Sequence, residues 1–468
     1  MKKGSELTLE VEKFADRGKS IARVDGYVIF INGGVPGDQL RVRVTKRKKK
    51  FAEAVPIEII EASPRRIEAV CDYFGVCGGC KWQHVAYEAQ LEAKRQSVQE
   101  AFTHHGGIDN IVVEPTIPAD PVFRYRNKME FSFSAERWLT SDEIASGKTF
   151  DTSFALGLHV PGNFNKVLDL ESCHLHSELG VRIVNAVRRF ALEKEWRPWH
   201  IRRHTGYLRH LVLRQAARTD DFMVNVVTSG FVEDRMSALS EMFQQQFPEI
   251  TTLVNTINSG VAQTAFGEEV HTIYGSGVIR DMIGPHTFEI ASNAFFQTNT
   301  HQAQKLYDVV AEFAEFKNTD FVYDLYSGAG TISIYVADQV EKVLGVELIE
   351  EAVQNARANA LSNGVKNVAF ETGDMMRLFK EDFIAAHGRP DVLIVDPPRA
   401  GMHPKVVEQI RRLRPERFVY VSCNPLTQAR DLSMLADTYD VDTVRPVDLF
   451  PHTYHIESVA KLHLKEIS

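Results

Sequence analysis

The sequence lacks the features that would place it in a membrane or outside the cell. Its 468 residues contain no run of 18 apolar residues, which excludes an obvious transmembrane helix. The lysines near the start have no apolar segment behind them, so we expect no secretory signal and a cytoplasmic protein. Cysteine is scarce, at five residues, which excludes a disulfide-stapled fold. Internal repeats and low-complexity linkers are also missing.

The composition is that of an ordinary globular protein. Hydrophobic residues make up 44% and charged residues 25%, and at roughly 150 residues per domain the length suggests two to four domains. The net charge of −8 argues weakly against a polyanionic partner. However, seven of the ten residues 41–50 are cationic, and a second basic stretch at 202–214 follows two tryptophans. Local patches decide phosphate contacts, so a nucleic acid partner stays open.

Four of the five cysteines have a spacing that suggests a metal site. Cys71, Cys77 and Cys80 form a C-x5-C-x2-C pattern around a glycine pair, and Cys173 follows far downstream. Thiolates are soft ligands, and four of them suit either tetrahedral zinc or a [4Fe–4S] cluster. The spacing alone does not choose between these metals, and four unrelated reduced thiols are the remaining interpretation.

The pattern of the chain predicts three domains. Residues 1–62 alternate short strands with glycine turns, which is typical of a small OB-like β-barrel. Residues 63–290 mix strands and helices as an α+β central domain, of which we expect part of 84–118 to pack on the C-terminal domain. The expected elements before residue 291 are strands Leu7–Val11, Gly18–Val24, Gly26–Ile31, Asp38–Val44, Ala52–Ile60, Asn127–Ser134, Ser153–His159, Leu208–Arg214 and Phe222–Val227, and a helix Tyr87–Thr103.

From residue 291 to 468 strands and helices alternate regularly. This alternation predicts an α/β fold with a doubly wound, Rossmann-like parallel sheet, whose ligands bind at the carboxyl ends of the strands. The expected strands are Phe321–Leu325, Lys342–Val346, Val368–Phe370, Val392–Val395 and Phe418–Val421.

Polar residues at three of these strand ends indicate the cofactor. The loop that contains Gly328 has Ser333 where a dinucleotide fingerprint needs its third glycine. Glu347 ends the second strand, where it can accept hydrogen bonds from both ribose hydroxyls, and Asp374 follows the third strand, a usual place for an adenine contact. Each residue alone could be a turn or a cap, but together they favour S-adenosylmethionine over NAD.

Cys423 ends the last of these strands. A lone cysteine there is most often a small buried hydrophobe, and Glu457 taken alone is an ordinary strand carboxylate. Yet Asp396, in a neighbouring Asp-Pro-Pro-Arg turn, is expected at the same edge of the sheet. A thiolate nucleophile, a carboxylate base and a methyl donor form a coherent set for group transfer.

Five motifs together resemble the RNA uracil-5-methyltransferase family. They are FQTN at 296–299, DLYSGAGT at 324–331, DPPR at 396–399, SCNP at 422–425 and LFPHT-x-H-x-E at 449–457. The resemblance is greatest to the bacterial 23S rRNA enzymes, which have an N-terminal TRAM barrel and a four-cysteine iron–sulfur cluster, and it covers nearly the whole chain. Members that act on tRNA typically lack the barrel and the cluster cysteines, so the resemblance favours rRNA.

The resemblance implies a role for each motif. Cys423 would add to carbon 6 of a flipped-out uracil, and Glu457 would remove the proton from carbon 5, since a glutamate is ionised at pH 7 unless burial leaves it without partners. Arg399 would orient groups or contact a phosphate. The S-adenosylmethionine contacts implied are Gln297, Tyr326 (where relatives often have phenylalanine), Glu347 and Asp396.

The resemblance also implies the accessory parts. Cys71, Cys77, Cys80 and Cys173 would ligate a [4Fe–4S] cluster, with a structural or RNA-positioning role because the reaction moves no electrons. The basic stretch Arg41–Lys50 would contact RNA phosphates outside the active site. We expect a monomer with no membrane partner.

Four alternatives stay open. A tRNA uridine-5 methyltransferase would share all of the chemistry. An adenine amino-methyltransferase would want an aromatic residue where Arg399 stands, and a cytosine-5 enzyme would want a proline where Ser422 stands. A catalytically silent RNA-binding iron–sulfur protein would bind the cofactor without transferring its methyl group.

Overall fold

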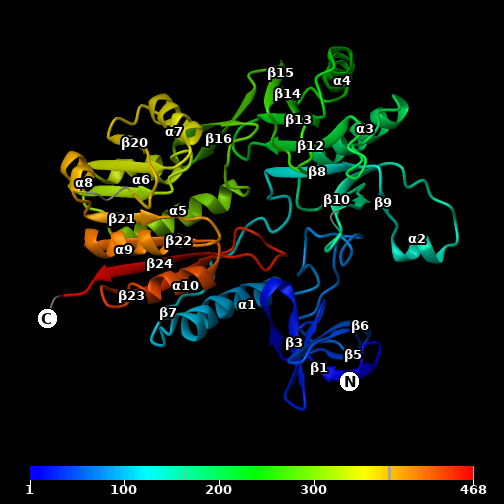
Figure 1. Cartoon of the computed structure of the whole chain (residues 1–468), viewed down its shortest axis with the longest axis horizontal. Helices are drawn as coiled ribbons and strands as arrows, with labels where there is room; N and C mark the ends of the chain where they lie inside the picture. The colour runs from blue at the N-terminus through cyan, green and yellow to red at the C-terminus, as the bar shows by residue number, and fades with distance from the viewer. Residues whose placement is uncertain (164, 378–380, 467–468) are drawn as a thin grey trace.

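Three bodies follow one another along the chain, an N-terminal barrel, a central sheet and a C-terminal sheet (Figure 1). The computed structural model describes residues 1–163, 165–377 and 381–466. Within these residues no helix combines the length and the apolar character needed to cross a membrane.

The barrel is a six-stranded sheet in the order β1-β5-β6-β4-β3-β2. Along β5, Leu40, Val42 and Val44 are buried while the arginines between them are exposed, because successive side chains of a strand point to opposite faces. All five expected strands are confirmed. The sixth strand, β2, has two residues, too few to show the alternation of buried and exposed side chains that identifies a strand in a sequence. The elements are β1 (Glu6–Glu10), β2 (Lys13–Phe14), η1 (Asp16–Gly18), β3 (Ser20–Val24), β4 (Tyr27–Ile31), β5 (Gln39–Arg47) and β6 (Phe51–Glu61).

The central sheet has the order β15-β14-β13-β12-β8-β10-β11-β9. Apolar residues of helices α3 and α4 join its strands in one core, and the four strands expected here are confirmed to within two residues at each end. The elements are β8 (Lys128–Ser134), β9 (Arg137–Trp138), α2 (Ser141–Ala145), β10 (Ala155–His159), β11 (Val167–Asp169), α3 (Glu178–Glu193), β12 (Leu208–Gln215), β13 (Phe222–Thr228), α4 (Glu233–Gln246), β14 (Thr252–Ile257) and β15 (Glu269–Tyr274). A hairpin of β16 (Val278–Ile283) and β17 (His286–Ala291) leads to the next body.

The C-terminal sheet has the order β20-β19-β18-β21-β22-β24-β23-β7. Its first five strands are parallel, as expected, whereas β24 is antiparallel to both β22 and β23. Helices α5, α6 and α7 cover one face, and α1, α9 and α10 cover the other. The elements are α5 (Thr300–Ala314), β18 (Phe321–Leu325), α6 (Thr331–Val336), η3 (Ala337–Gln339), β19 (Lys342–Glu347), α7 (Glu350–Ser362), β20 (Val368–Thr372), α8 (Glu381–His387), β21 (Val392–Val395), α9 (Pro404–Leu413), β22 (Arg417–Ser422), α10 (Pro425–Ser433), β23 (Tyr439–Val447) and β24 (Glu457–Leu464).

Two elements that precede the central sheet belong to the C-terminal one. Helix α1 (Tyr87–Glu100), continued by the π-helical turn η2 (Ala101–Gly106), contributes Val98 to the core under α9 and α10. Strand β7 (Val112–Val113) pairs with β23 at the sheet edge. Figure 1 shows α1 between the barrel and this sheet.

Candidate active site and cysteine pocket

Cys423 and Glu457 lie near each other at the edge of the C-terminal sheet. Strands β22 and β24 pair antiparallel with Ser422 opposite Ser458. The ladder stops at this pair, so Cys423 is the next residue along one segment and Glu457 the next along the other, and the charge of Glu457 acts on the Cys423 thiol. The sheet therefore joins the two candidate catalytic residues although they come from separate motifs.

The residues after Cys423 explain why the strand ends there. The Asn424 side chain accepts a hydrogen bond from the backbone N–H of Leu426 at 3.2 Å and caps helix α10, whose first residue is Pro425. Proline at the first helical position needs no backbone donor, so strand, cap and helix follow within three residues. The Cys423 thiol is left half-buried at the edge of the sheet.

Acidic groups surround the Cys423 thiol. Burial raises its pKa to about 11, and the charges of Glu457 and Asp396 add to this rise. Glu457 is only 6% exposed, and burial and then the Asp396 charge raise its pKa well above the usual value. Burial and then Asp324 raise the pKa of Asp396 to about 7. The expected ionised glutamate is thus shifted toward its protonated form, because the sheet removes water from its carboxyl.

The Glu347 carboxylate closes the candidate cofactor loop. Its Oε2 accepts from the N–H of Gly328 at 3.1 Å, and its Oε1 accepts from Leu348 and Ile349 at 2.8 and 3.0 Å. A carboxylate has about four acceptor positions, and three of those of Glu347 are already used. One position therefore remains for a ribose hydroxyl without rearrangement, whereas the sequence predicted hydrogen bonds from both ribose hydroxyls.

The loop after β18 has the backbone of a ligand cradle. Tyr326, Gly328 and Gly330 have φ values of +64°, +54° and +77°, and a left-handed φ costs a non-glycine residue about 1–2 kcal/mol. A Cβ on Gly330 would lie 2.6 Å from Phe370, so only glycine fits there, whereas a Cβ on Gly328 would meet open space. The cradle is therefore tight toward the sheet and open toward a ligand.

Gln297 and Asp374 each have a hydrogen bond that holds the local backbone. The Gln297 carbonyl accepts from Asn127 Nδ2 at 2.9 Å, which ties its loop to the central domain. Asp374 accepts from the backbone N–H of Met376 at 2.9 Å and so holds the turn after β20. Tyr326, Gly328, Glu347, Asp374 and Asp396 thus lie at or just after the carboxyl ends of parallel strands of one sheet, whereas the hydrogen bond of Gln297 is to the central domain.

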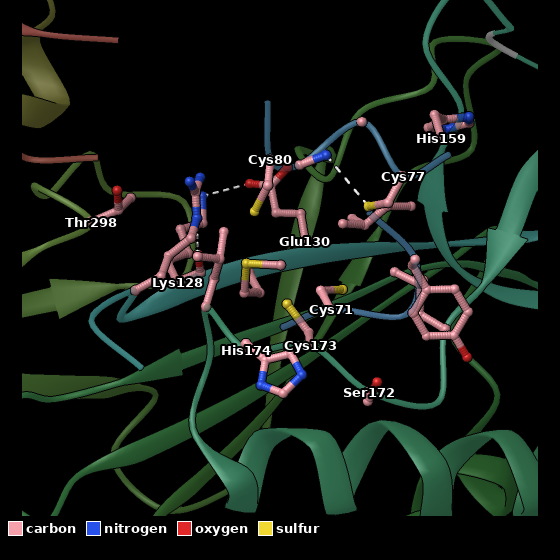
Figure 2. A pocket seen from close by; sticks show the side chains of 18 of the residues that line it. Cys71, Cys77, Cys80, Lys128, Glu130, His159, Ser172, Cys173, His174 and Thr298 are labelled. Atoms are coloured by element: carbon pink, nitrogen blue, oxygen red, sulfur yellow. Dashed lines mark hydrogen bonds and ion pairs between the residues drawn. The ribbon is translucent and has the colours of Figure 1, made fainter. Parts of the chain in front are cut away.

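The other four cysteines line one cavity of about 510 Å³ in the central domain (Figure 2). The loop that carries Cys77 and Cys80 is held closely, since a Cβ on Gly78 would lie 2.9 Å from the carbonyl oxygen of His159. The Gln83 side chain connects the two ends of this loop, because it accepts from Cys71 N at 3.2 Å and donates to the Cys80 sulfur at 3.2 Å.

These four thiols influence one another's ionisation. Burial raises the pKa of Cys77 to about 11 and that of Cys80 to about 12, and in both cases a negative charge on Cys173 would raise it further. In the described part of the chain, no group of three His, Cys, Asp or Glu side chains is placed to hold a metal ion. In a [4Fe–4S] cluster each thiolate binds a different iron, so its cysteines stand farther apart than the ligands of a single ion. Four thiols around one cavity fit such a cluster.

His452 connects the cysteine loop with the segment that carries Glu457. Its carbonyl accepts from the backbone N–H groups of Lys81 and Trp82 at 2.8 and 2.9 Å, directly after Cys80. Its own N–H donates to Gln90 Oε1 at 2.8 Å, and its ring stacks on Phe123 with centroids 4.1 Å apart. The two regions are therefore joined through the backbone of His452, which lies five residues before Glu457.

A buried ion pair fixes helix α1 to the same segment. Lys94 and Asp448 are both fully buried, with Nζ and Oδ1 2.6 Å apart. Lys94 also donates to the carbonyl of Phe450 at 3.0 Å, and Asp448 accepts from the Tyr87 hydroxyl at 2.9 Å. Sequence reasoning missed this pair, and its one signal was a lysine on the apolar face of the expected helix.

Comparisons with known proteins agree with this architecture. A profile of the tRNA (Uracil-5-)-methyltransferase family matches residues 280–465, and a TRAM domain profile matches residues 1–57. An uncharacterized RNA methyltransferase of Chlorobaculum tepidum is 41% identical, covering 98% of this chain and 96% of its own. A second, from Bacteroides thetaiotaomicron, is 41% identical over 96% of this chain and all of its own.

A solved structure matches along almost the whole chain. It is the tRNA (uracil-54, C5)-methyltransferase of Pyrococcus abyssi in complex with S-adenosyl-L-homocysteine, with a TM-score of 0.76 and 29% identity over 97% of this chain and 99% of that one. Fold and comparisons together define an RNA methyltransferase that uses S-adenosylmethionine. Within that class, the chain belongs to the RNA uracil-5-methyltransferase family.

Proposed function

We propose that the chain methylates carbon 5 of a uridine in 23S rRNA, with Cys423 as nucleophile and Glu457 as base. The observation that carries this proposal is the pairing of β22 with β24 as far as Ser422 and Ser458, which brings the next residues of the two segments, a thiol and a carboxyl group, close enough for the Glu457 charge to act on Cys423. The pair lies where β22 ends, at the edge where ligands of doubly wound sheets bind.

The chemistry follows from the weakness of uracil carbon 5 as a nucleophile. The Cys423 thiolate forms a bond to carbon 6, and the displaced π electrons make an enolate whose carbon 5 is nucleophilic. Bound S-adenosylmethionine supplies the electrophilic methyl group that carbon 5 takes. Glu457 then removes the proton from carbon 5, the double bond re-forms and the thiolate leaves.

The environment of Glu457 suits this last step. A base removes a proton most effectively when its pKa lies near the operating pH, and burial moves the pKa of this carboxyl upward. The residues that would hold S-adenosylmethionine are Gln297, Tyr326, Gly328, Glu347, Asp374 and Asp396.

The β5–β6 hairpin of the barrel is the RNA contact that we propose. Arg41 and Arg43 are already paired with Glu58 and Glu6, at 2.6 and 3.0 Å. In the described part of the chain, the lysines of the hairpin tip, residues 48–50, have no such partner. Unpaired cations release counterions from the RNA backbone, so we assign phosphate contact to the tip rather than to the whole stretch 41–50.

We propose that Cys71, Cys77, Cys80 and Cys173 ligate a [4Fe–4S] cluster. Support comes from the four thiols that line one cavity and from the soft-ligand preference of iron–sulfur clusters. The bonds from Lys81 and Trp82 to His452 suggest a structural role, because they connect this site with the catalytic segment.

A tRNA is the second candidate substrate. The argument from the barrel is weakened because the Pyrococcus abyssi tRNA enzyme aligns with 97% of this chain. Incubating the enzyme and S-adenosylmethionine with 23S rRNA or tRNA transcripts, followed by mass spectrometry of 5-methyluridine, decides between them. Product in the tRNA alone would replace the rRNA proposal.

The chemistry is tested with an rRNA fragment that carries 5-fluorouridine. Fluorine cannot leave as a cation, so the enzyme should stay bound to the RNA through carbon 6 in the presence of S-adenosylmethionine. We expect a denaturant-stable adduct with the wild-type protein, none with Cys423→Ala, and no lasting adduct with ordinary uridine. Absence of the adduct, with RNA and cofactor binding confirmed, would contradict the covalent mechanism.

A further inference from the structure

Arg399 connects the three segments of the candidate active site. Its guanidinium Nη2 lies 2.6 Å from Nδ1 of His455. Its carbonyl oxygen accepts from Asn424 Nδ2 at 3.0 Å and from Thr427 Oγ1 at 3.3 Å. The backbone of Arg399 is thus held by the segment after Cys423, and its side chain is held by the segment before Glu457.

The Arg399–His455 contact has one possible direction. A guanidinium has only donors, so His455 Nδ1 accepts and the imidazole is neutral. Burial lowers the pKa of His455 to about 4, and the charges of Arg399, Lys94 and Arg126 lower it further, opposed by Asp16. His455 therefore stays an acceptor at neutral pH, and its proton is on Nε2.

Arg399 also acts on the thiol that the proposed reaction uses, because its carbonyl oxygen is bonded to Asn424, the residue directly after Cys423. Of the groups that act on Cys423, burial, Glu457 and Asp396 oppose its ionisation, whereas the charge of Arg399 favours the thiolate. A cation placed beside a sulfur increases its reactivity by this means. The position of the Arg399 guanidinium therefore affects the fraction of Cys423 that is present as thiolate.

We propose that His455 is a positioning residue that holds the Arg399 guanidinium against the Cys423 sulfur and so maintains the reactive thiolate. The proposal rests on the proposed function, in which Cys423 is the nucleophile. It assigns Arg399 to the thiol in the free enzyme, before any RNA is present. A contact between Arg399 and an RNA phosphate would be a different use of the same cation.

The test measures the reactivity of Cys423 in the free enzyme. His455→Asn keeps an acceptor close to the place of Nδ1, whereas His455→Leu removes it and keeps most of the bulk. Alkylation at pH 8 is followed by mass spectrometry of the tryptic peptide 418–430, which contains Cys423 alone among the cysteines. We expect His455→Leu and Arg399→Gln to slow alkylation about 5- to 10-fold, the size of a pKa rise approaching one unit, and His455→Asn to restore most of the rate.

A second readout separates charge from access. Iodoacetate and iodoacetamide have similar size, but only iodoacetate is anionic and attracted by a nearby guanidinium. We expect the ratio of the iodoacetate rate to the iodoacetamide rate to fall about 3-fold in His455→Leu and to stay near the wild-type value in His455→Asn.

The outcomes distinguish this inference from the function on which it rests. If both rates and their ratio are unchanged in His455→Leu while RNA affinity falls, Arg399 contacts RNA and the inference is wrong. If both rates fall equally in His455→Leu and the ratio stays constant, His455 acts by packing only, which also overturns it. Failure of the wild-type enzyme to form the 5-fluorouridine adduct would instead overturn the proposed function, whatever the alkylation rates show.

Discussion

The two thiol-bearing regions of the molecule are built in different ways. Cys423 directly follows a buried strand, and the charged groups that act on it are two carboxyl groups and one guanidinium. Cys71, Cys77, Cys80 and Cys173 lie in loops around a cavity, and their principal charged neighbours are one another. Burial raises the thiol pKa in both regions, so burial alone does not separate a nucleophile from a ligand. The partners of the sulfur make the difference.

Removing the proposed base gives the largest expected effect at the sheet edge. Glu457→Gln keeps the shape of the side chain but cannot take the carbon 5 proton, so we expect methylation to fall about 10²- to 10⁴-fold. Because the step after methyl transfer is blocked, a covalent adduct with ordinary uridine RNA should accumulate on denaturing gels. Glu416→Gln, an exposed position just before β22, is the matched control. Undiminished turnover in Glu457→Gln would assign the base elsewhere.

Breaking the buried ion pair tests how firmly helix α1 is held to the segment that carries Glu457. Lys94→Met leaves Asp448 buried without its cation, and such losses cost about 3–5 kcal/mol of unfolding free energy. Lys13→Met removes a part-exposed pair with Glu100 and should cost less than about 1 kcal/mol. Urea denaturation of both variants makes the comparison. Equal losses of unfolding free energy in the two variants would show that Lys94 does not fix α1 to the segment that carries Glu457.

Loss of a cysteine should affect stability in the pocket but not at the sheet edge. We expect Cys80→Ser to abolish iron binding in anaerobically purified protein and to lower the melting temperature by roughly 5 °C, as a loss of one to two kcal/mol would. Cys423→Ser should keep both the iron and the melting temperature. Iron analysis and thermal scans measure the two quantities. A Cys80→Ser protein with full iron content would remove Cys80 from the ligand set.

The central sheet and the edge that carries Cys423 should also respond to pH with opposite sign. Burial lowers the pKa of His210 in the central sheet to about 4, so the unfolded chain binds more protons between pH 6.5 and 4 and acid destabilises the fold. Burial raises the pKa of Asp396 to about 7. Between about pH 4 and 7 the folded chain therefore binds more protons than the unfolded chain, and the unfolding free energy falls as the pH rises through this range.

Two variants isolate these opposite contributions. His210→Gln should remove about 2 kcal/mol of the destabilisation seen on going from pH 7 to pH 5. Asp396→Asn should raise the unfolding free energy at pH 8 by up to about 4 kcal/mol relative to the wild type, with little change at pH 4. Urea titrations at these pH values are the measurement. Parallel pH profiles for wild type and either variant would contradict the assignment.

Sequence patterns located the strands of the C-terminal sheet well. The expected Phe321–Leu325 and Val392–Val395 are β18 and β21 without a shift. Short, largely apolar runs between helices are typical of strands in the middle of a parallel sheet, where both faces are buried. Motifs at the ends of such strands fall at one edge of the sheet, which is why the residues proposed to bind the cofactor lie together. The antiparallel strand β24 lay outside this pattern, although its motif carries Glu457.

What the sequence determined alone is the periodicity of the strands, the identity of the groups at their ends and the resemblance to a family. The tertiary structure decided which of these groups meet. The pairing of Lys94 with Asp448 spans 354 positions, and the contact between Arg399 and His455 depends on two loops that follow different strands. Local patterns extend over a few residues, whereas burial, charge and hydrogen-bond partners depend on distances that only the folded chain sets.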